Sequence, residues 1–91
     1  MKKIILHFEY GMFPTWVEKI DENGNIDPSE IFKGEIVDLI EEWYMLNKSV
    51  YDLFLETREE SSESDEISFL TKQILQKVKK DYPDIEIYYV P

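Results

Sequence analysis

The stretch that decides the fold runs from Glu35 to Thr57 and has the sequence EIVDLIEEWYMLNKSVYDLFLET. Projected at about 100° per residue, its apolar residues gather on one side and its acidic residues on the other. The central line holds Ile36, Ile40, Trp43, Asn47, Val50 and Phe54. It is widened by Val37, Tyr44, Tyr51 and Leu55 on one side and by Leu39, Leu46 and Leu53 on the other. The pattern predicts a long helix packed between a sheet and a second helix, and the weak helix formers at 47–49 favour a bend or break there.

Two strands are predicted upstream of this helix. Residues 2–9 alternate so that Ile4, Leu6 and Phe8 share one face, which predicts a strand with that face buried. Gly11 and Pro14 indicate a chain reversal, and residues 15–20 alternate again. The two segments together predict a β-hairpin.

Two turn signals follow the hairpin. Asn23-Gly24 predicts a tight turn, because both residues readily adopt positive φ values. Asp27 followed by proline is typical of a helix start, with the Asp27 side chain capping the first free N–H groups. Because Lys33-Gly34 soon interrupts it, we expect a single helical turn over Pro28–Phe32.

The rest of the chain completes an α+β fold. Residues 58–65 are polar and acidic, which is typical of a loop. A second helix is expected from Asp65 to Lys80, and a last strand from Ile85 to Val90. The element order β-β-α-α-β predicts a three-stranded, mainly antiparallel sheet covered by a two-helix hairpin. The apolar first strand is expected at the centre, with the last strand either parallel to the first or antiparallel to the second.

Composition bounds the class of protein. A length of 91 residues predicts a single domain over 1–91, and a hydrophobic content of 43% suffices for a core. The absence of cysteine excludes disulfides, thiolate metal sites and thiol catalysis. The N-terminal apolar run, Ile4 to Leu6, is too short for a signal peptide, and no stretch reaches the ~20 apolar residues that span a bilayer. We therefore expect a cytoplasmic protein.

The net charge of −10 is concentrated in one part of the chain. Residues 35–66 contain eleven acidic and two basic residues, whereas residues 1–34 and 67–91 are nearly neutral. This charge argues against direct binding of nucleic acid or an anionic membrane, since both need a basic face. It favours a basic protein as the partner.

Much of this acidic charge surrounds Met45 on the outer face of the long helix. Like charges at i and i+3 or i+4 destabilise a helix by about 0.2–0.5 kcal/mol per pair. The pattern is compatible with a solvated surface that keeps the protein soluble, and with a docking surface in which Met45 is an apolar anchor. Phe69 is expected on the polar side of the second helix. There it could pack under a loop, form an oligomer contact or bind a partner. The predicted partner-binding residues are Asp38, Glu41, Glu42, Met45, Asp52, Glu56, Glu59, Glu60 and Phe69.

No catalytic or metal site is predicted. His7 is the single histidine and lies in a predicted strand, where a structural role is favoured. Residues 21–27 alternate oxygen-bearing side chains like the start of a calcium loop, but Ile26 and Phe32 stand where an EF-hand needs glycine and glutamate. Exposed carboxylate pairs such as Glu41 and Glu42 lack the burial that tunes a general acid. We expect a non-enzymatic protein with no cofactor.

Motifs spread over most of the chain carry a resemblance to known proteins. They are Tyr10-Gly11, Pro14-Thr15-Trp16-Val17-Glu18, Asn23-Gly24-Asn25-Ile26, Glu41-Glu42-Trp43 and the closing segment Ile85–Tyr89. With them the chain resembles small acidic bacterial proteins, among them immunity proteins of contact-dependent growth inhibition and related polymorphic-toxin systems. The resemblance implies an antidote that binds the C-terminal domain of a cognate toxin, often a nuclease, and blocks its active site. The motifs are turn and core positions, so no functional residue is carried over.

Three functions are therefore compared. The first is an immunity protein that neutralises a toxin domain through its acidic surface, and this is the function we predict. The second is a nucleic-acid mimic or antitoxin-like regulator that titrates a basic protein. The third is a small enzyme or metal-dependent protein centred on His7. The sequence does not predict the oligomeric state.

Overall fold

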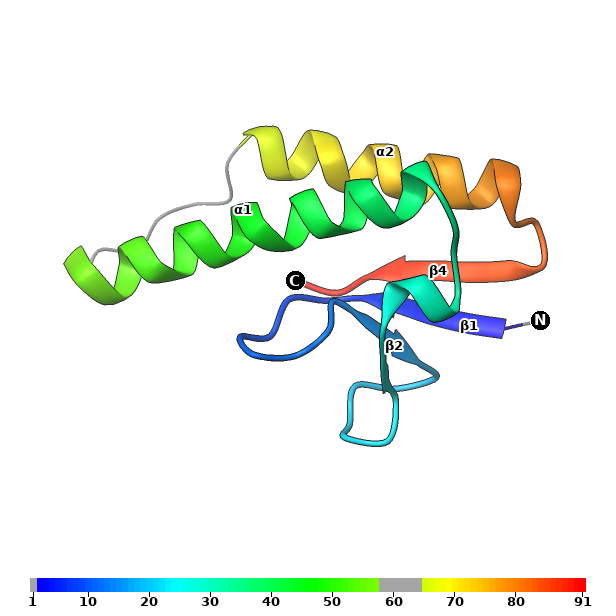
Figure 1. Ribbon diagram of the computed structural model, residues 1–91, viewed down its shortest axis with the longest axis horizontal. Helices are drawn as coiled ribbons and strands as arrows, with labels where there is room; N and C mark the ends of the chain where they lie inside the picture. The colour runs from blue at the N-terminus through cyan, green and yellow to red at the C-terminus, as the bar shows by residue number, and fades with distance from the viewer. Residues whose placement is uncertain (1, 58–64) are drawn as a thin grey trace.

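In the computed structural model, which describes residues 2–57 and 65–91, two helices lie side by side over one face of a sheet (Figure 1). The elements in chain order are β1 (Lys2–Leu6), β2 (Thr15–Val17), β3 (Asn25–Ile26), the 3₁₀ turn η1 (Pro28–Glu30), α1 (Glu35–Thr57), α2 (Asp65–Asp81) and β4 (Ile85–Tyr89). The predicted α+β class is confirmed. Part of the predicted loop, residues 58–64, lies outside the described residues.

The sheet is mixed and has the spatial order β3-β2-β1-β4. β1 pairs antiparallel with β2 and parallel with β4. The prediction that the first strand is central and adjoins the last strand is confirmed. The parallel direction follows from the helical hairpin, because α2 ends at the same end of the sheet as the N-terminus (Figure 1).

The expectation of three strands is wrong, whereas two of the three strand pairings are antiparallel, as expected of a mainly antiparallel sheet. The sheet has a fourth strand, β3, which holds only Asn25 and Ile26 and pairs with β2. Two residues are too few to show an alternating pattern. β2 is also shorter than predicted, because Glu18 adopts φ 69° directly after it and so ends the extended backbone.

The core lies between the sheet and the two helices. The predicted inner face of β1 is confirmed, since Ile4 and Leu6 are fully buried and Phe8 is half-buried. The buried cluster comprises Ile4, Leu6, Phe32, Ile36, Ile40, Trp43, Ile67, Leu70, Ile74 and Val78. Ile5 and Trp16 face each other in register on the other side of the sheet and are also buried.

One hydrogen bond joins the helices inside this core. Trp43 Nε1 donates to Thr71 Oγ1 at 2.8 Å, and Thr71 Oγ1 donates to the Ile67 carbonyl at 2.8 Å. Both side chains are buried, so the indole N–H of Trp43 and the hydroxyl of Thr71 would lack partners without these bonds.

The bounds of α1 agree with the predicted helix, and the helix is continuous through 47–49, so it does not break there. Asn47 Nδ2 donates to the Trp43 carbonyl at 2.8 Å, and Ser49 Oγ donates to the Met45 carbonyl at 3.0 Å. Each of these side chains therefore bonds to the carbonyl one turn earlier in the helix, a common arrangement for polar residues within a helix.

The predicted turn at Asn23-Gly24 forms, but neither residue has a positive φ. Gly24 is required by space instead, because a Cβ atom there would collide with the carbonyl oxygens of Lys19 and Val17. Asp21 Oδ1 fastens the turn by accepting bonds from Asn23 N at 3.0 Å and Gly24 N at 2.8 Å.

The predicted single turn after Asp27 is confirmed as η1. The Asp27 side chain caps it as expected, with Oδ1 accepting from Ser29 N at 2.9 Å. Gly34 then adopts φ 66°, which favours glycine, and turns the chain into α1.

Candidate functional site

α1 presents an acidic outer face because the core takes its inner face. Ile36, Ile40 and Trp43 are buried, and the acidic residues project about 180° away from them. We call this surface the acidic face. It consists of Asp38, Glu41, Glu42, Met45, Asp52 and Glu56, all of them exposed predicted binding residues.

The five carboxylates of the acidic face have no ion-pair partner among residues 2–57 and 65–91. The ion pairs in those ranges join Lys19 to Asp21 at 3.3 Å and Lys77 to Glu35 at 3.0 Å, and neither involves a residue of this face. Lys48, which is also on α1, has its Nζ 5.8 Å from the centre of the Tyr10 ring. The negative charge of the face is therefore not neutralised by the described part of the chain.

The remaining predicted binding residues are placed differently. Phe69 is 66% exposed on α2, on the side opposite the buried stripe that includes Ile67 and Ile74. It belongs to a different helix from the acidic face. Glu59 and Glu60 lie outside the described residues.

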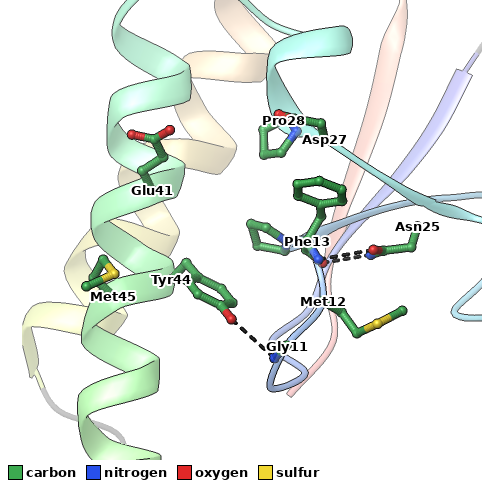
Figure 2. A pocket seen from close by; sticks show the side chains of 10 residues that line it. Gly11, Met12, Phe13, Asn25, Asp27, Pro28, Glu41, Tyr44 and Met45 are labelled. Carbon is green, nitrogen blue, oxygen red and sulfur yellow. Dashed lines mark hydrogen bonds between the residues drawn. The ribbon is translucent and has the colours of Figure 1, made fainter.

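A hollow of about 490 Å³ lies between α1 and the β1–β2 loop (residues 7–14), as Figure 2 shows. Its lining residues are Gly11, Met12, Phe13, Pro14, Asn25, Asp27, Pro28, Glu41, Tyr44 and Met45. Most are apolar, two carry a carboxylate, and none is basic. Glu41 and Met45 belong to the acidic face as well, so the hollow adjoins that face.

The loop wall of the hollow is fixed by hydrogen bonds within the free protein. Asn25 Oδ1 accepts from Phe13 N at 3.0 Å, while Asn25 Nδ2 donates to the Phe13 carbonyl at 2.8 Å (Figure 2). Gly11, at φ 82°, donates its N–H to the Tyr44 hydroxyl at 3.3 Å. Because these contacts already hold the loop against β3 and α1, the hollow exists before any partner binds.

Sequence reasoning did not find the loop side of this hollow. Phe13 and Asn25 are twelve residues apart and are joined only through the Asn25 side chain. The available signal was the reversal at Gly11 and Pro14, which predicted a turn but not what the turn packs against. The α1 side was found in part, as Glu41 and Met45.

The C-terminal end of α1 contradicts the predicted core pattern. Tyr51, Leu53, Phe54 and Leu55 were expected on the buried side, yet each is exposed. The reason is length, because the last turns of α1 extend past the end of the sheet (Figure 1). Tyr51 still contacts the β1–β2 loop, with its ring 5.1 Å from that of Tyr10.

His7 is engaged with the backbone at the C-terminus. Its Nδ1 lies 3.0 Å from the Val90 carbonyl, an acceptor only, so Nδ1 carries the proton and donates it. Within the described residues no group of three or more His, Cys, Asp or Glu side chains is arranged to hold a metal ion.

The side chains with shifted pKa values lie outside the hollow. Burial by itself would raise the pKa of Asp21, but the hydrogen bond from Gly24 and the ion pair with Lys19 outweigh it and lower that pKa. The pKa of Lys77 is raised, first by its hydrogen bond with Glu35 and then by the charge of that carboxylate. The pKa of Tyr88 is raised chiefly by its hydrogen bond with Glu86.

None of the helices in the described ranges is both long and apolar enough to cross a membrane.

Comparison of the chain with protein-family models, curated proteins and solved structures gave no match. On the geometry described above, the candidate site consists of the acidic face of α1 and the preformed hollow beside it.

Proposed function

We propose that this chain is an immunity protein that acts in the cytoplasm and neutralises a toxin domain by binding it with the acidic face. The partner surface is basic, as the substrate cleft of a nuclease is. Binding occludes that cleft, so the acidic face takes the place of nucleic acid. The observation that carries the proposal is that five exposed carboxylates on one side of α1 have no ion-pair partner among the described residues.

The spacing of these carboxylates supports a binding role over simple solubility. Asp38 lies three and four residues before Glu41 and Glu42, and Asp52 lies four residues before Glu56. Each such pair destabilises the free helix by about 0.2–0.5 kcal/mol. A basic partner relieves this repulsion when it binds, whereas dispersed surface charges would give solubility without it.

The first experiment is co-expression with the C-terminal domain of a toxin encoded by the adjacent gene. We expect a one-to-one complex that protects the cell, and an association rate that falls steeply as salt is raised from low to high concentration. An adjacent gene that encodes no toxin, or a toxin domain that does not co-purify, would overturn the proposal.

Charge reversal then tests the face itself. Glu42→Lys with Asp52→Lys should slow association about tenfold or more, because both substitutions place like charges against a basic surface. The matched control is Glu22→Lys with Asp84→Lys, which changes the net charge equally at exposed positions outside α1. Equal effects of the two pairs would contradict docking at the acidic face.

The nucleic-acid mimic predicts a different breadth of binding. A mimic would bind unrelated basic proteins such as histones and cytochrome c with similar affinity, whereas an immunity protein binds one partner tightly. Comparable affinity for all of them would favour the mimic and count against the immunity function.

A further inference from the structure

We propose that the hollow between α1 and the β1–β2 loop is a subsite for one arginine side chain of the protein partner. This inference rests on the proposed function, since the basic partner supplies the arginine. It goes further than the proposed function, because charge attraction to the acidic face does not say where any single side chain of the partner binds.

The lining of the hollow matches the chemistry of arginine. An arginine side chain has an apolar stem and a planar cation that stacks on aromatic rings and forms paired bonds with carboxylates. The hollow offers apolar and aromatic walls, including Phe13, Tyr44 and Met45, together with two carboxylates. Its volume of about 490 Å³ is within the range of sites that enclose small ligands, ~300–1,000 Å³.

Both carboxylates have capacity for a cation. Glu41 has no ion pair among residues 2–57 and 65–91. Asp27 uses Oδ1 for both of its bonds to Ser29, and in the described part of the chain Oδ2 has no hydrogen-bond partner. No lysine or arginine lines the hollow to neutralise them.

A second hollow on the molecule shows the opposite arrangement. It is lined by Lys33, Glu35, Ile36, Lys77, Asp81 and Tyr82. There Glu35 is already bound to Lys77 at 3.0 Å, so its charge is neutralised within the protein. The uncompensated carboxylates therefore distinguish the hollow beside α1 as the cation subsite.

The walls are also suited to an anchor contact. Phe13 is 47% exposed and Met45 is 56% exposed, so a partner side chain can cover both without unfolding any element. The Asn25 bonds to Phe13 hold the loop in place beforehand. A preformed pocket loses little conformational entropy on binding.

The direct test is an NMR titration of the free protein with N-acetyl-arginine methylamide, with the neutral citrulline analogue and the lysine analogue as comparisons. We expect saturable shifts of the backbone amides of Gly11, Phe13 and Asn25 with the arginine compound alone. No shifts, equal shifts with citrulline, or equal shifts with lysine would overturn the assignment.

Two variants localise the effect. Glu41→Gln should weaken binding of the arginine compound about threefold to tenfold, because it removes one carboxylate from the hollow. Glu56→Gln makes the same change on the same face about 22 Å further along the helix, and should leave the affinity within twofold. Similar losses in the two variants would show attraction to the whole face and refute the subsite.

The complex with the toxin domain separates this inference from the proposed function. We expect Glu41→Gln with Phe13→Ala to speed dissociation about tenfold or more, with an unchanged thermal midpoint as the check on folding. If the complex forms and Glu42→Lys with Asp52→Lys weakens it while Glu41→Gln with Phe13→Ala does not, the subsite is wrong and the function stands. If arginine binds in the hollow but no toxin complex forms, the function is wrong and the subsite is a cation site without that partner.

Discussion

Thr71→Val removes the hydroxyl that accepts the indole N–H of Trp43 between the two helices. The donor and acceptor are 2.8 Å apart, and the two residues are 1% and 7% exposed, so water cannot replace the lost partner without opening the core. Valine has nearly the shape of threonine, and the substitution therefore tests the hydrogen bond and not the packing.

The expected loss follows from the donor that remains. A buried N–H left without a partner costs about 1–3 kcal/mol. For a domain of this length, each kcal/mol corresponds to about 4–8 °C in Tm. We therefore expect Thr71→Val to lower Tm by about 4–24 °C.

Thermal unfolding measures the change in Tm and urea unfolding measures the free energy, both followed by circular dichroism at 222 nm, which does not depend on tryptophan fluorescence. Thr71→Ser is the matched control, because it keeps the hydroxyl and loses one methyl group. Trp43→Phe removes the donor, so Thr71→Val should cost much less in that background than in the wild type. A neutral Thr71→Val, or an equal cost in both backgrounds, would refute the reasoning.

Two further predictions concern the turn before β3. Gly24→Ala should destabilise the fold by about 1–3 kcal/mol, since its Cβ would collide with two backbone oxygens. Urea unfolding measures this loss, with Asn23→Ala as the control, whose unfolding free energy should stay within about 0.5 kcal/mol of the wild type. Equal losses in the two variants would contradict the prediction. Asp21 has a lowered pKa in the folded protein, so the stability that its carboxylate contributes is present above pH 3.8 and is lost as the pH falls through the lowered value. Asp21→Asn should therefore flatten the fall of the unfolding free energy as the pH drops below 3.8. An unchanged slope in a pH series of urea titrations would argue against it.

The elements that could be predicted are those whose pattern repeats over many residues. The bounds of α1 followed from the recurrence of Ile36, Ile40 and Trp43, and the centre of the sheet followed from the apolar face of β1. The exposure of Phe54 could not be predicted, because periodicity shows which side of a helix is apolar but not how far its neighbours extend. The same limit applies to β3, whose two residues are defined by pairing with β2 and not by their own pattern.

The candidate site was predictable only where it lies on α1. The exposure of Glu41 and Met45 followed from their position opposite the core. The hollow beside them depends on where the β1–β2 loop packs, and that is decided by contacts such as Asn25 with Phe13 and Tyr44 with Gly11. Single side-chain contacts between distant segments leave no periodic signal in the sequence.

The parallel pairing of β1 with β4 has a consequence for how the chain is made. Ile4 pairs with Ile87, so the central strand is synthesised first and its neighbour on one edge last. Contacts between such distant residues slow folding, whereas the local turns of α1 and α2 form quickly. Until residues 85–89 leave the ribosome, an apolar strand edge stays open to other nascent chains. Translation that stops before Ile85 should therefore yield an aggregation-prone product, even though both helices and the whole acidic face have already been made.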